Sequence, residues 1–259
     1  MQLSLRIFWL PKKGNTSGEY EDAFWPPEPV NVDSERFRFA VADGATESSF
    51  AGPWAKLLVR AYCRDQLSEK KIRKQLPRLR REWYSSIESA ALPWYAEEKL
   101  TQGAFATMLG LTLSELVWDS TAIGDSCLFQ VRGGEIITSF PLARSDEFNN
   151  RPMLMSSNSS NWSEELSHLT RARGAWERMD VFYLMTDAIA SWFLRSVENG
   201  ERPSALLDPV DEGEDFERWI ESLRESGAMR NDDVTVLRVA TSRVFPLPLG
   251  EGGAPKARG

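Results

Sequence analysis

Acidic residues stand at four points where an apolar run of this sequence begins or ends. Asp43 and Asp187 each follow such a run, Asp232 comes two residues before another, and the pair Glu21–Asp22 precedes a short apolar segment. A single aspartate at the end of a strand commonly forms a turn or caps a helix. Four such positions suggest that the residues form one site, because the ends of neighbouring strands would bring these carboxylates together.

Carboxylates held close together repel one another, and a hard divalent cation is the usual remedy. No basic side chain is expected among these acidic residues. The chain has one histidine, His168, and two cysteines, Cys63 and Cys127, so the ligands are expected to be oxygen atoms alone. Such a ligand set favours Mg²⁺ or Mn²⁺ over zinc or copper. The single histidine also argues against a histidine-rich zinc site and a Ser-His-Asp triad.

The composition favours a globular protein that binds neither nucleic acid nor membranes. The chain has 259 residues, 31 Lys and Arg against 38 Asp and Glu, and a formal net charge of −7. An acidic balance argues against a nucleic-acid binder. No apolar run approaches the length of a membrane span, and the first residues lack a signal-peptide cleavage pattern, so a cytoplasmic location is expected. Two cysteines make no disulfide framework, which fits a reducing compartment.

Hydrophobic periodicity divides the chain into strands and helices. The predicted strands are Gln2–Leu10, Arg36–Asp43, Ala106–Leu113, Leu116–Ile123, Ser126–Val131, Asp180–Met185 and Val234–Ala240. The predicted helices are Trp54–Leu67, Leu79–Leu100, Ala188–Val197 and Phe216–Leu223, and Pro93 should kink or interrupt the second of them.

Three further segments stand out by composition. Residues 70–81 carry seven basic side chains, which indicate either a solvated helix face or a docking patch for an acidic partner or phosphorylated substrate. The polar segment 144–162 is interpreted as a long mobile loop or flap. Residues 246–259 are rich in Pro and Gly and are expected to form a disordered tail.

Six segments of the chain resemble, in the same order, the motifs of the metal-dependent Ser/Thr protein phosphatases, the PPM or phosphatase-2C-type family. The run Ile123–Ile136 is the closest match and is similar to the family's Gly-Asp-Ser hairpin. Each motif is weak alone, but together they extend from residue 21 to residue 236, as in a divergent member of bacterial type. The other five segments are Glu21–Phe24, Ala40–Glu47, Gly103–Leu113, Asp180–Ala188 and Asn231–Val236.

The resemblance implies an α+β fold, a four-layer αββα sandwich of two antiparallel sheets flanked by helices, formed by residues 1–245. It implies hydrolysis of phosphoserine and phosphothreonine in a protein substrate by a water that bridges two Mg²⁺ or Mn²⁺ ions. Asp125 could help to hold a third ion, although a turn cap explains it equally well. One alternative is a catalytically weak module that binds a phosphoprotein or regulates a partner. Another is hydrolysis of a different phosphomonoester.

The resemblance also implies a role for each acidic position. Asp43 would bridge the two ions, and Asp187 and Asp232 would hold one of them, so Asp43 and Asp187 are the expected catalytic residues. Glu21 would reach the other ion together with the carbonyl of Gly44, where the missing side chain permits a close approach. The full set of expected ligands is Glu21, Asp22, Asp43, Gly44, Asp187 and Asp232, with Asp22 supporting Glu21 or replacing it.

The chain departs from the family pattern in several places. Family members commonly have an arginine four residues before the acidic pair, where it can hold the substrate phosphate, and this residue is Ser17 here. Lys12 or Lys13 could substitute for it, although an ammonium group cannot reproduce a bidentate guanidinium. The other departures are Ala188 in place of a glycine and Asp233 in place of an asparagine. His168 is expected to be a surface residue.

Overall fold

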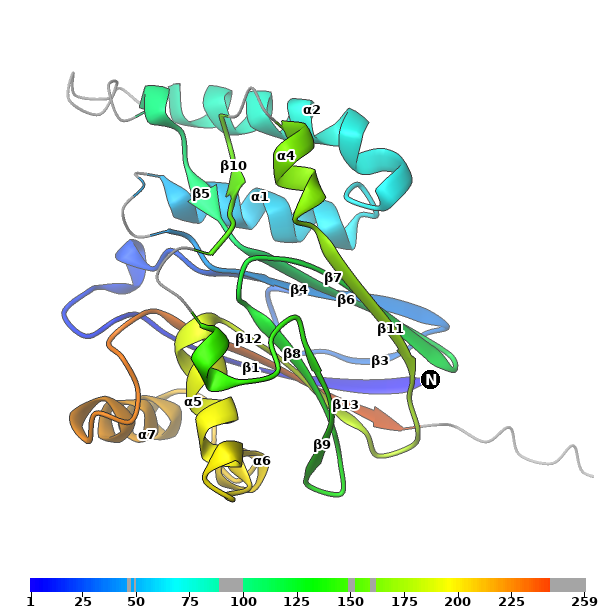
Figure 1. Cartoon of the computed structure of the whole chain (residues 1–259), viewed down its shortest axis with the longest axis vertical. Helices are drawn as coiled ribbons and strands as arrows, with labels where there is room; N and C mark the ends of the chain where they lie inside the picture. The colour runs from blue at the N-terminus through cyan, green and yellow to red at the C-terminus, as the bar shows by residue number, and fades with distance from the viewer. Residues whose placement is uncertain (46–47, 49, 89–99, 149–151, 159–161, 243–259) are drawn as a thin grey trace, which may run out of the picture.

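Two antiparallel sheets lie face to face in this protein, and helices cover the outer face of each sheet (Figure 1). The computed structural model describes residues 1–45, 48, 50–88, 100–148, 152–158 and 162–242. The arrangement is the αββα sandwich of the α+β class that the sequence predicts. The expected tail at 246–259 and the kink at Pro93 lie outside the described residues.

Within the described residues, one sheet has six strands and the other has five. The first follows the order β3-β1-β13-β12-β8-β9 and consists of β3 (Asn31–Asp33), β1 (Gln2–Leu10), β13 (Val234–Ser242), β12 (Val181–Met185), β8 (Cys127–Arg132) and β9 (Glu135–Phe140). The second follows the order β11-β7-β6-β4-β2 and consists of β11 (Thr170–Ala175), β7 (Val117–Ile123), β6 (Met108–Ser114), β4 (Arg36–Ala42) and β2 (Ala23–Trp25). A short separate pair joins β5 (Phe105–Ala106) to β10 (Met155–Ser156).

The helices form two groups, one on each sheet (Figure 1). The five-stranded sheet is covered by α1 (Ala51–Cys63), with α2 (Glu69–Glu88) and the short α4 (Trp162–Ser167) outside it. The six-stranded sheet is covered by α5 (Asp187–Glu198), α6 (Pro203–Leu207) and α7 (Glu214–Glu225). Two single turns of 3-10 helix are η1 (Ser17–Glu19) and η2 (Ser145–Glu147).

Strand β4 shows why the central strands are apolar on both faces. Phe39 and Val41 belong to the core between the two sheets, whereas Ala40 and Ala42 belong to the core beneath α1. None of these four side chains is exposed. Alternate residues of a strand point to opposite faces, so both layers are filled by one short run. The small alanines leave room for the buried Trp54 of α1.

Every strand predicted from periodicity is present, and its ends lie within two residues of the expected positions. Strand β2 ends at Trp25, and the proline-rich residues 26–29 that follow it belong to no strand or helix. The polar edge strand β11 escaped prediction, since Arg171 and Arg173 break the apolar alternation. Inside the segment 144–162, the structure has η2 and strand β10.

The basic segment 70–81 lies on α2, so the second helix begins ten residues before the predicted start at Leu79. Its buried residues recur every three or four positions and form one apolar stripe. The basic residues fill the positions between them, which concealed the stripe in the sequence. The buried residues are Ile72, Leu76, Leu79, Trp83 and Ile87. Among the described residues, no helix has the length and apolar character needed to cross a lipid bilayer.

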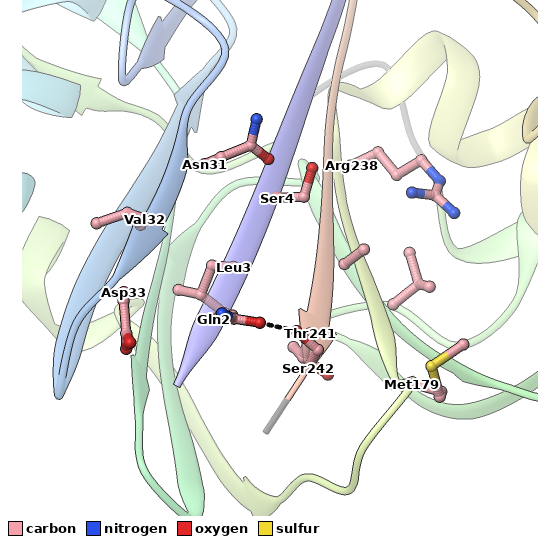
Figure 2. Close-up of a pocket in the computed structure, with 12 residues that line it drawn as sticks. Gln2, Leu3, Ser4, Asn31, Val32, Asp33, Met179, Arg238, Thr241 and Ser242 are labelled. Atoms are coloured by element: carbon pink, nitrogen blue, oxygen red, sulfur yellow. Dashed lines mark hydrogen bonds between the residues drawn. The ribbon is translucent and has the colours of Figure 1, made fainter. Parts of the chain in front are cut away.

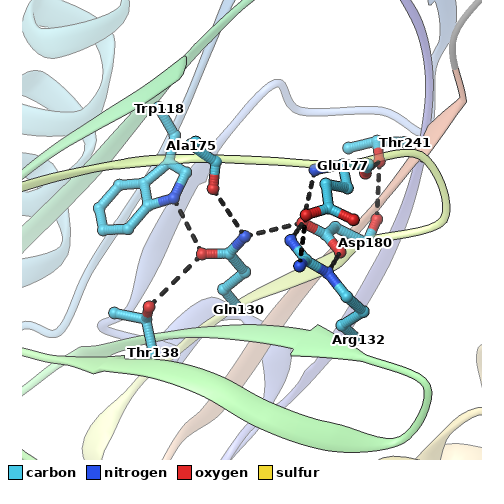
Figure 3. A network of polar contacts seen from close by, with 8 residues as sticks. All are labelled: Trp118, Gln130, Arg132, Thr138, Ala175, Glu177, Asp180 and Thr241. Carbon is cyan, nitrogen blue, oxygen red and sulfur yellow. Dashed lines mark hydrogen bonds and ion pairs between the residues drawn. The ribbon is translucent and has the colours of Figure 1, made fainter. Parts of the chain in front are cut away.

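A buried polar network ties the two sheets together (Figure 3). The indole of Trp118, on β7, donates to the side-chain oxygen of Gln130, on β8, at 2.9 Å. The amide of Gln130 donates to Asp180 at 2.7 Å, and the guanidinium of Arg132 also donates to Asp180 at 2.7 Å. Burial alone would raise the pKa of Asp180, but these hydrogen bonds and the main-chain N–H of Glu177 outweigh it and lower the pKa. Asp180 is therefore held as a carboxylate with no exposed surface.

We expect Asp180→Ala to lower the free energy of unfolding by about 1–3 kcal/mol, because it leaves one of the two N–H groups of the buried Gln130 amide without its acceptor, while the amide still donates to the carbonyl of Ala175. The difference in the free energy of unfolding between the wild type and the variant should shrink as the pH falls below about 4. A carboxyl with a lowered pKa stabilises the fold only while it is ionised. Urea unfolding at pH 7 and pH 3 measures both effects. Glu177→Ala is the control, because this exposed side chain contributes an ion pair worth less than about 1 kcal/mol and its main-chain N–H is retained. Equal losses in the two variants would contradict this role for Asp180.

Candidate metal centre

Strand register brings several turns together at one end of the six-stranded sheet. Leu10, at the end of β1, pairs with Val234, at the start of β13. Met185, at the end of β12, pairs with Val236 on one side and Cys127 on the other. The turns before β8 and β13 and the turn after β12 therefore lie side by side. They carry Asp125, Asp187, Asp232 and Asp233.

The five-stranded sheet adds two carboxylates to the same end of the molecule. Ala23 of β2 pairs with Ala42 of β4, so Asp22 and Asp43 lie at the adjacent ends of two neighbouring strands. Both strands contact β13 of the facing sheet. The pKa of Asp43 is raised by the charges of Asp232, Asp125 and Asp233, which shows that the carboxylates from the two sheets interact. The strand ends thus gather four of the five predicted acidic residues, without Glu21, into one group with Asp125 and Asp233. This group, called here the carboxylate cluster, consists of Asp22, Asp43, Asp125, Asp187, Asp232 and Asp233.

Asp43 is the residue at which these charges meet. Burial raises its pKa to about 8, and the neighbouring carboxylates add to the effect while Arg230 opposes it. Its main-chain N–H donates to the hydroxyl of Thr107 at 2.9 Å, and that hydroxyl is 2.8 Å from the hydroxyl of Ser126. These contacts hold the end of β4 in place. Without a bound cation, Asp43 is mostly protonated at neutral pH.

Asp22 is buried beside Asp43. Burial raises its pKa well above the usual range, and the charge of Asp43 raises it further. One carboxyl oxygen, Oδ2, accepts a hydrogen bond from the hydroxyl of Thr235 at 2.6 Å. The other oxygen, Oδ1, is buried without a hydrogen-bond partner among the described residues. The adjacent Glu21 is half-buried, and its main-chain N–H donates to Asp233.

Two further carboxyl oxygens of the cluster are buried without a hydrogen-bond partner among the described residues, namely Oδ1 of Asp125 and Oδ1 of Asp187. Burial raises the pKa of Asp125 to about 6. A buried oxygen acceptor that lacks a partner is costly, so such atoms need an explanation. Carboxyl oxygens without a partner are the kind of atom that an oxygen-binding cation such as Mg²⁺ or Mn²⁺ takes as a ligand. Asp125 thus belongs to the cluster, a place that its sequence alone left open.

Gly44 directly follows Asp43 and is buried. A Cβ atom at this position would lie 2.5 Å from the main-chain oxygen of Glu21 and 3.0 Å from the Cβ of Ala51. Because backbone cannot yield as a flexible side chain can, any other residue would push the Glu21 segment away. The close approach of the Glu21 backbone therefore requires a glycine at position 44. This requirement could not be predicted from the sequence.

A cation does lie among the carboxylates, contrary to the expectation from sequence. The guanidinium of Arg230 contacts Asp187, and its Nε is 3.3 Å from Asp232. The arginine lies two residues before Asp232 in the chain, but its partner Asp187 comes from a different turn. Among the residues that the structure describes, no three acidic, histidine or cysteine side chains are placed to share one ion. Arg230 stands between the two carboxylates that the resemblance assigns to a metal.

Asp233 has a structural role in the described chain. Its two oxygens accept hydrogen bonds from the main-chain N–H groups of Lys12 and Glu21, at 2.8 and 2.7 Å. It therefore fastens both ends of the segment that connects β1 with β2. Within that segment, the Nζ of Lys13 lies 3.0 Å from Glu221 of α7, so Lys13 is an unsuitable substitute for a phosphate-binding arginine.

Other residues considered from the sequence lie apart from the cluster's chemistry. His168 is exposed after α4, as expected for a surface residue. Both cysteines are free thiols, and burial raises the pKa of each. A hollow of about 580 Å³ lies at the opposite end of β1 and β13, lined by residues such as Gln2, Asn31 and Ser242 (Figure 2). None of the carboxylates described above lines it.

The family comparison identifies the class of protein. Residues 20–233 match the family model described as protein phosphatase 2C. Because the match spans most of the chain, the protein belongs to this family of Ser/Thr phosphatases. No curated protein sequence matches the chain.

Solved phosphatases share the fold at low sequence identity. The serine/threonine phosphatase PstP/Ppp of Mycobacterium tuberculosis has a TM-score of 0.58 and 17% identity, over 94% of this chain and 100% of that one. Stp1 of Staphylococcus aureus has a TM-score of 0.60 and 12% identity, over 94% and 96%. The catalytic domain of PstP in complex with two manganese ions has a TM-score of 0.52 and 18% identity, over 93% and 100%. At these identities the likeness shows the fold alone.

We expect Arg230→Gln to strengthen Mn²⁺ binding by roughly tenfold, or about 1.4 kcal/mol, because the guanidinium no longer competes for Asp187 and Asp232. The metal-free variant should melt a few degrees lower, since its carboxylates lose their countercharge. Calorimetric titration and thermal melting measure the two effects. Arg178→Gln removes an exposed arginine elsewhere and should change neither. If Arg230→Gln binds Mn²⁺ with wild-type affinity, Arg230 is no competitor.

Proposed function

We propose that this protein hydrolyses phosphoserine and phosphothreonine monoesters in a protein substrate, with two Mg²⁺ or Mn²⁺ ions held by the carboxylate cluster. The three buried carboxyl oxygens without partners, on Asp22, Asp125 and Asp187, are the observation that carries this proposal. The fold is shared with a phosphatase solved with two manganese ions, which supports the same metal class here. Bound ions of this kind acidify a water molecule and neutralise the charge of the phosphate.

Each acidic residue has a place in the proposed centre. Asp43 would lie between the two ions, and Asp187 and Asp232 would hold the second. Glu21 and the carbonyl of Gly44 would serve the first, with Asp22 behind them. Asp125 adds a carboxylate that could hold a third ion. Asp43 and Asp187 are therefore the proposed catalytic residues.

The chain's own hydrogen bonds would position this centre before any ion binds. Thr235 orients Asp22, Thr107 fixes the backbone at Asp43, and Asp233 holds the main chain at Glu21. Side chains that are locked by such contacts keep a constellation of ligands in its productive geometry. Metal binding would still require that Arg230 leave Asp187 and Asp232 and that the carboxylate side chains turn toward the ion.

Arg230 is the proposed phosphate-binding residue. The position of the family's arginine is Ser17, and Lys13 is paired with α7. When ions take Asp187 and Asp232, the guanidinium of Arg230 would be released beside the centre, where its planar fork can donate two hydrogen bonds to a phosphate. Its side chain is 45% exposed, so it can turn toward a substrate.

The pairing of Arg230 with Asp187 also favours a second candidate function. If the guanidinium remains in place of an ion, the protein would be a catalytically weak module that binds a phosphoprotein and regulates a partner. The raised pKa of Asp43 argues for the enzyme, because one arginine leaves that carboxyl largely protonated and a divalent ion would complete the neutralisation.

The basic segment 70–81 on α2 remains a proposed docking patch for the phosphorylated protein. Two of its residues have structural partners, since Lys71 pairs with Asp65 and Arg80 pairs with Glu165 at 2.6 Å. Lys70, Lys74, Arg78 and Arg81 are exposed and could contact an acidic partner. A cytoplasmic role in signalling, with a phosphoprotein rather than nucleic acid or a membrane as partner, completes the proposal.

We expect Mn²⁺-dependent hydrolysis of p-nitrophenyl phosphate and of a phosphothreonine peptide, abolished by a chelator and restored by added Mn²⁺. Asp43→Asn and Asp187→Asn should each lower kcat by about 10²–10³-fold, the loss typical of removing one electrostatic contributor. Asp119→Asn, an exposed aspartate on β7, should keep wild-type activity. Binding of Mn²⁺ and phosphopeptide without turnover in the wild type would contradict the enzyme and support the binding module.

A further inference from the structure

A groove runs beside the carboxylate cluster, along the segment that connects β1 with β2. It consists of two adjoining hollows of about 320 and 540 Å³, which share Trp9, Ser17, Phe24 and Pro27. One hollow reaches α1 and the other reaches α7, which lie on either side of this segment (Figure 1). Asp22 lines the hollow beside α1 and also belongs to the carboxylate cluster. The groove therefore lies next to the proposed catalytic centre, on the side of the buried Asp22.

The two halves of the groove carry opposite charges. Lys56 and Arg60 of α1 line the half next to Asp22, and both are exposed. Neither forms an ion pair with any carboxylate that the structure describes. The far half is lined by Glu212, Glu214 and Glu217. Glu212 lies 3.6 Å from Arg6 and Glu214 lies 3.8 Å from Arg218, whereas Glu217 has no ion-pair partner in the described part of the chain.

Aromatic side chains form the surface between the two charged halves. Trp9 is 42% exposed and lies near the end of β1, beyond the residues of β1 that pair with the edge strand β3. Its ring packs against Tyr20 at a centroid distance of 5.0 Å, which holds it in one orientation. The ring of Trp25 lies 5.9 Å from the guanidinium carbon of Arg60. Rigid, partly exposed aromatic residues of this kind commonly anchor a bound peptide.

We propose that this groove binds the part of a phosphoprotein substrate that adjoins the phosphorylated residue. An acidic substrate side chain would lie at Lys56 and Arg60, an apolar one on Trp9, and a basic one at Glu217. The order follows from the order of charges along the groove, since the phosphate is held at the cluster and the cationic half is nearer to it. This inference rests on the proposed function and names the sequence class of its substrate.

The test compares two phosphothreonine peptides of equal composition. In one, the acidic residues are next to the phosphothreonine and the basic residues are further away; in the other, the two groups are exchanged. Wild-type protein with Mn²⁺ should prefer the first peptide by about 3- to 10-fold in kcat/KM, mostly through KM. Exposed ion pairs are each worth up to about 1 kcal/mol, which sets this range.

The double variant Lys56→Glu, Arg60→Glu should reverse the preference. A reversal cannot result from partial unfolding, because a loss of folded protein would lower kcat/KM for both peptides by the same factor. Arg64→Glu is the matched control, since Arg64 is exposed one turn further along the end of α1 and does not line the groove. It should keep the wild-type preference. Equal use of both peptides by the wild type, or an equal shift in Arg64→Glu, would overturn the proposal.

Hydrolysis of p-nitrophenyl phosphate separates this inference from the proposed function, because that substrate has no flanking residues. If it is hydrolysed and the peptide preference is absent, the groove assignment fails while the phosphatase stands. If nothing is hydrolysed, fluorescence anisotropy with the same two labelled phosphopeptides tests the groove alone. Tighter binding of the first peptide, reversed in the double variant, would support the groove. Equal binding of both would overturn it.

Discussion

The electrostatic repulsion among buried carboxylates is the constraint on which the rest of this structure depends. Six aspartates converge where the strand ends of two sheets meet. Four of them, Asp22, Asp125, Asp187 and Asp233, are buried, which denies them the water that would screen their charge. Several contacts within the fold reduce this repulsion in part. Arg230 supplies a positive charge, Thr235 donates to Asp22, and backbone N–H groups donate to Asp233. The raised pKa of Asp43 shows that these contacts leave the cluster short of positive charge.

This shortage links the fold to the proposed chemistry. Three carboxyl oxygens keep unused acceptor capacity inside the protein, an arrangement that costs stability unless a cation binds. Arg230 contacts the carboxylates of the metal site and can also bind phosphate, so metal binding and phosphate binding become coupled through one side chain. The groove lined by Lys56 and Arg60 then extends recognition beyond the phosphate. In this account Ser17 lines a surface for the substrate chain in place of holding the phosphate itself.

Strand periodicity and strand-end aspartates are local signals, so the sequence predicted the strands and most of the cluster, whereas the sandwich was predicted from the resemblance to the phosphatase family. β1 was predicted with its observed ends, and Asp43, Asp187 and Asp232 lie at the sheet edge where strand order places them. Arg230 was missed because its contact with Asp187 joins residues 43 positions apart, and no local pattern records such a contact. The requirement for glycine at position 44 likewise arises from the backbone of Glu21, which approaches from another strand.

The most direct test of this account is the number of protons released when Mn²⁺ binds. Calorimetric titration in two buffers of different ionisation enthalpy, at pH 7 and again at pH 9, counts those protons. Because burial raises the pKa of Asp43 to about 8 and that of Asp22 well above its usual range, at least one proton should leave at pH 7, and fewer should leave at pH 9. If Mn²⁺ binds at pH 7 without releasing a proton, the carboxylates were already ionised. In that case Arg230 alone would neutralise the cluster, contrary to this account.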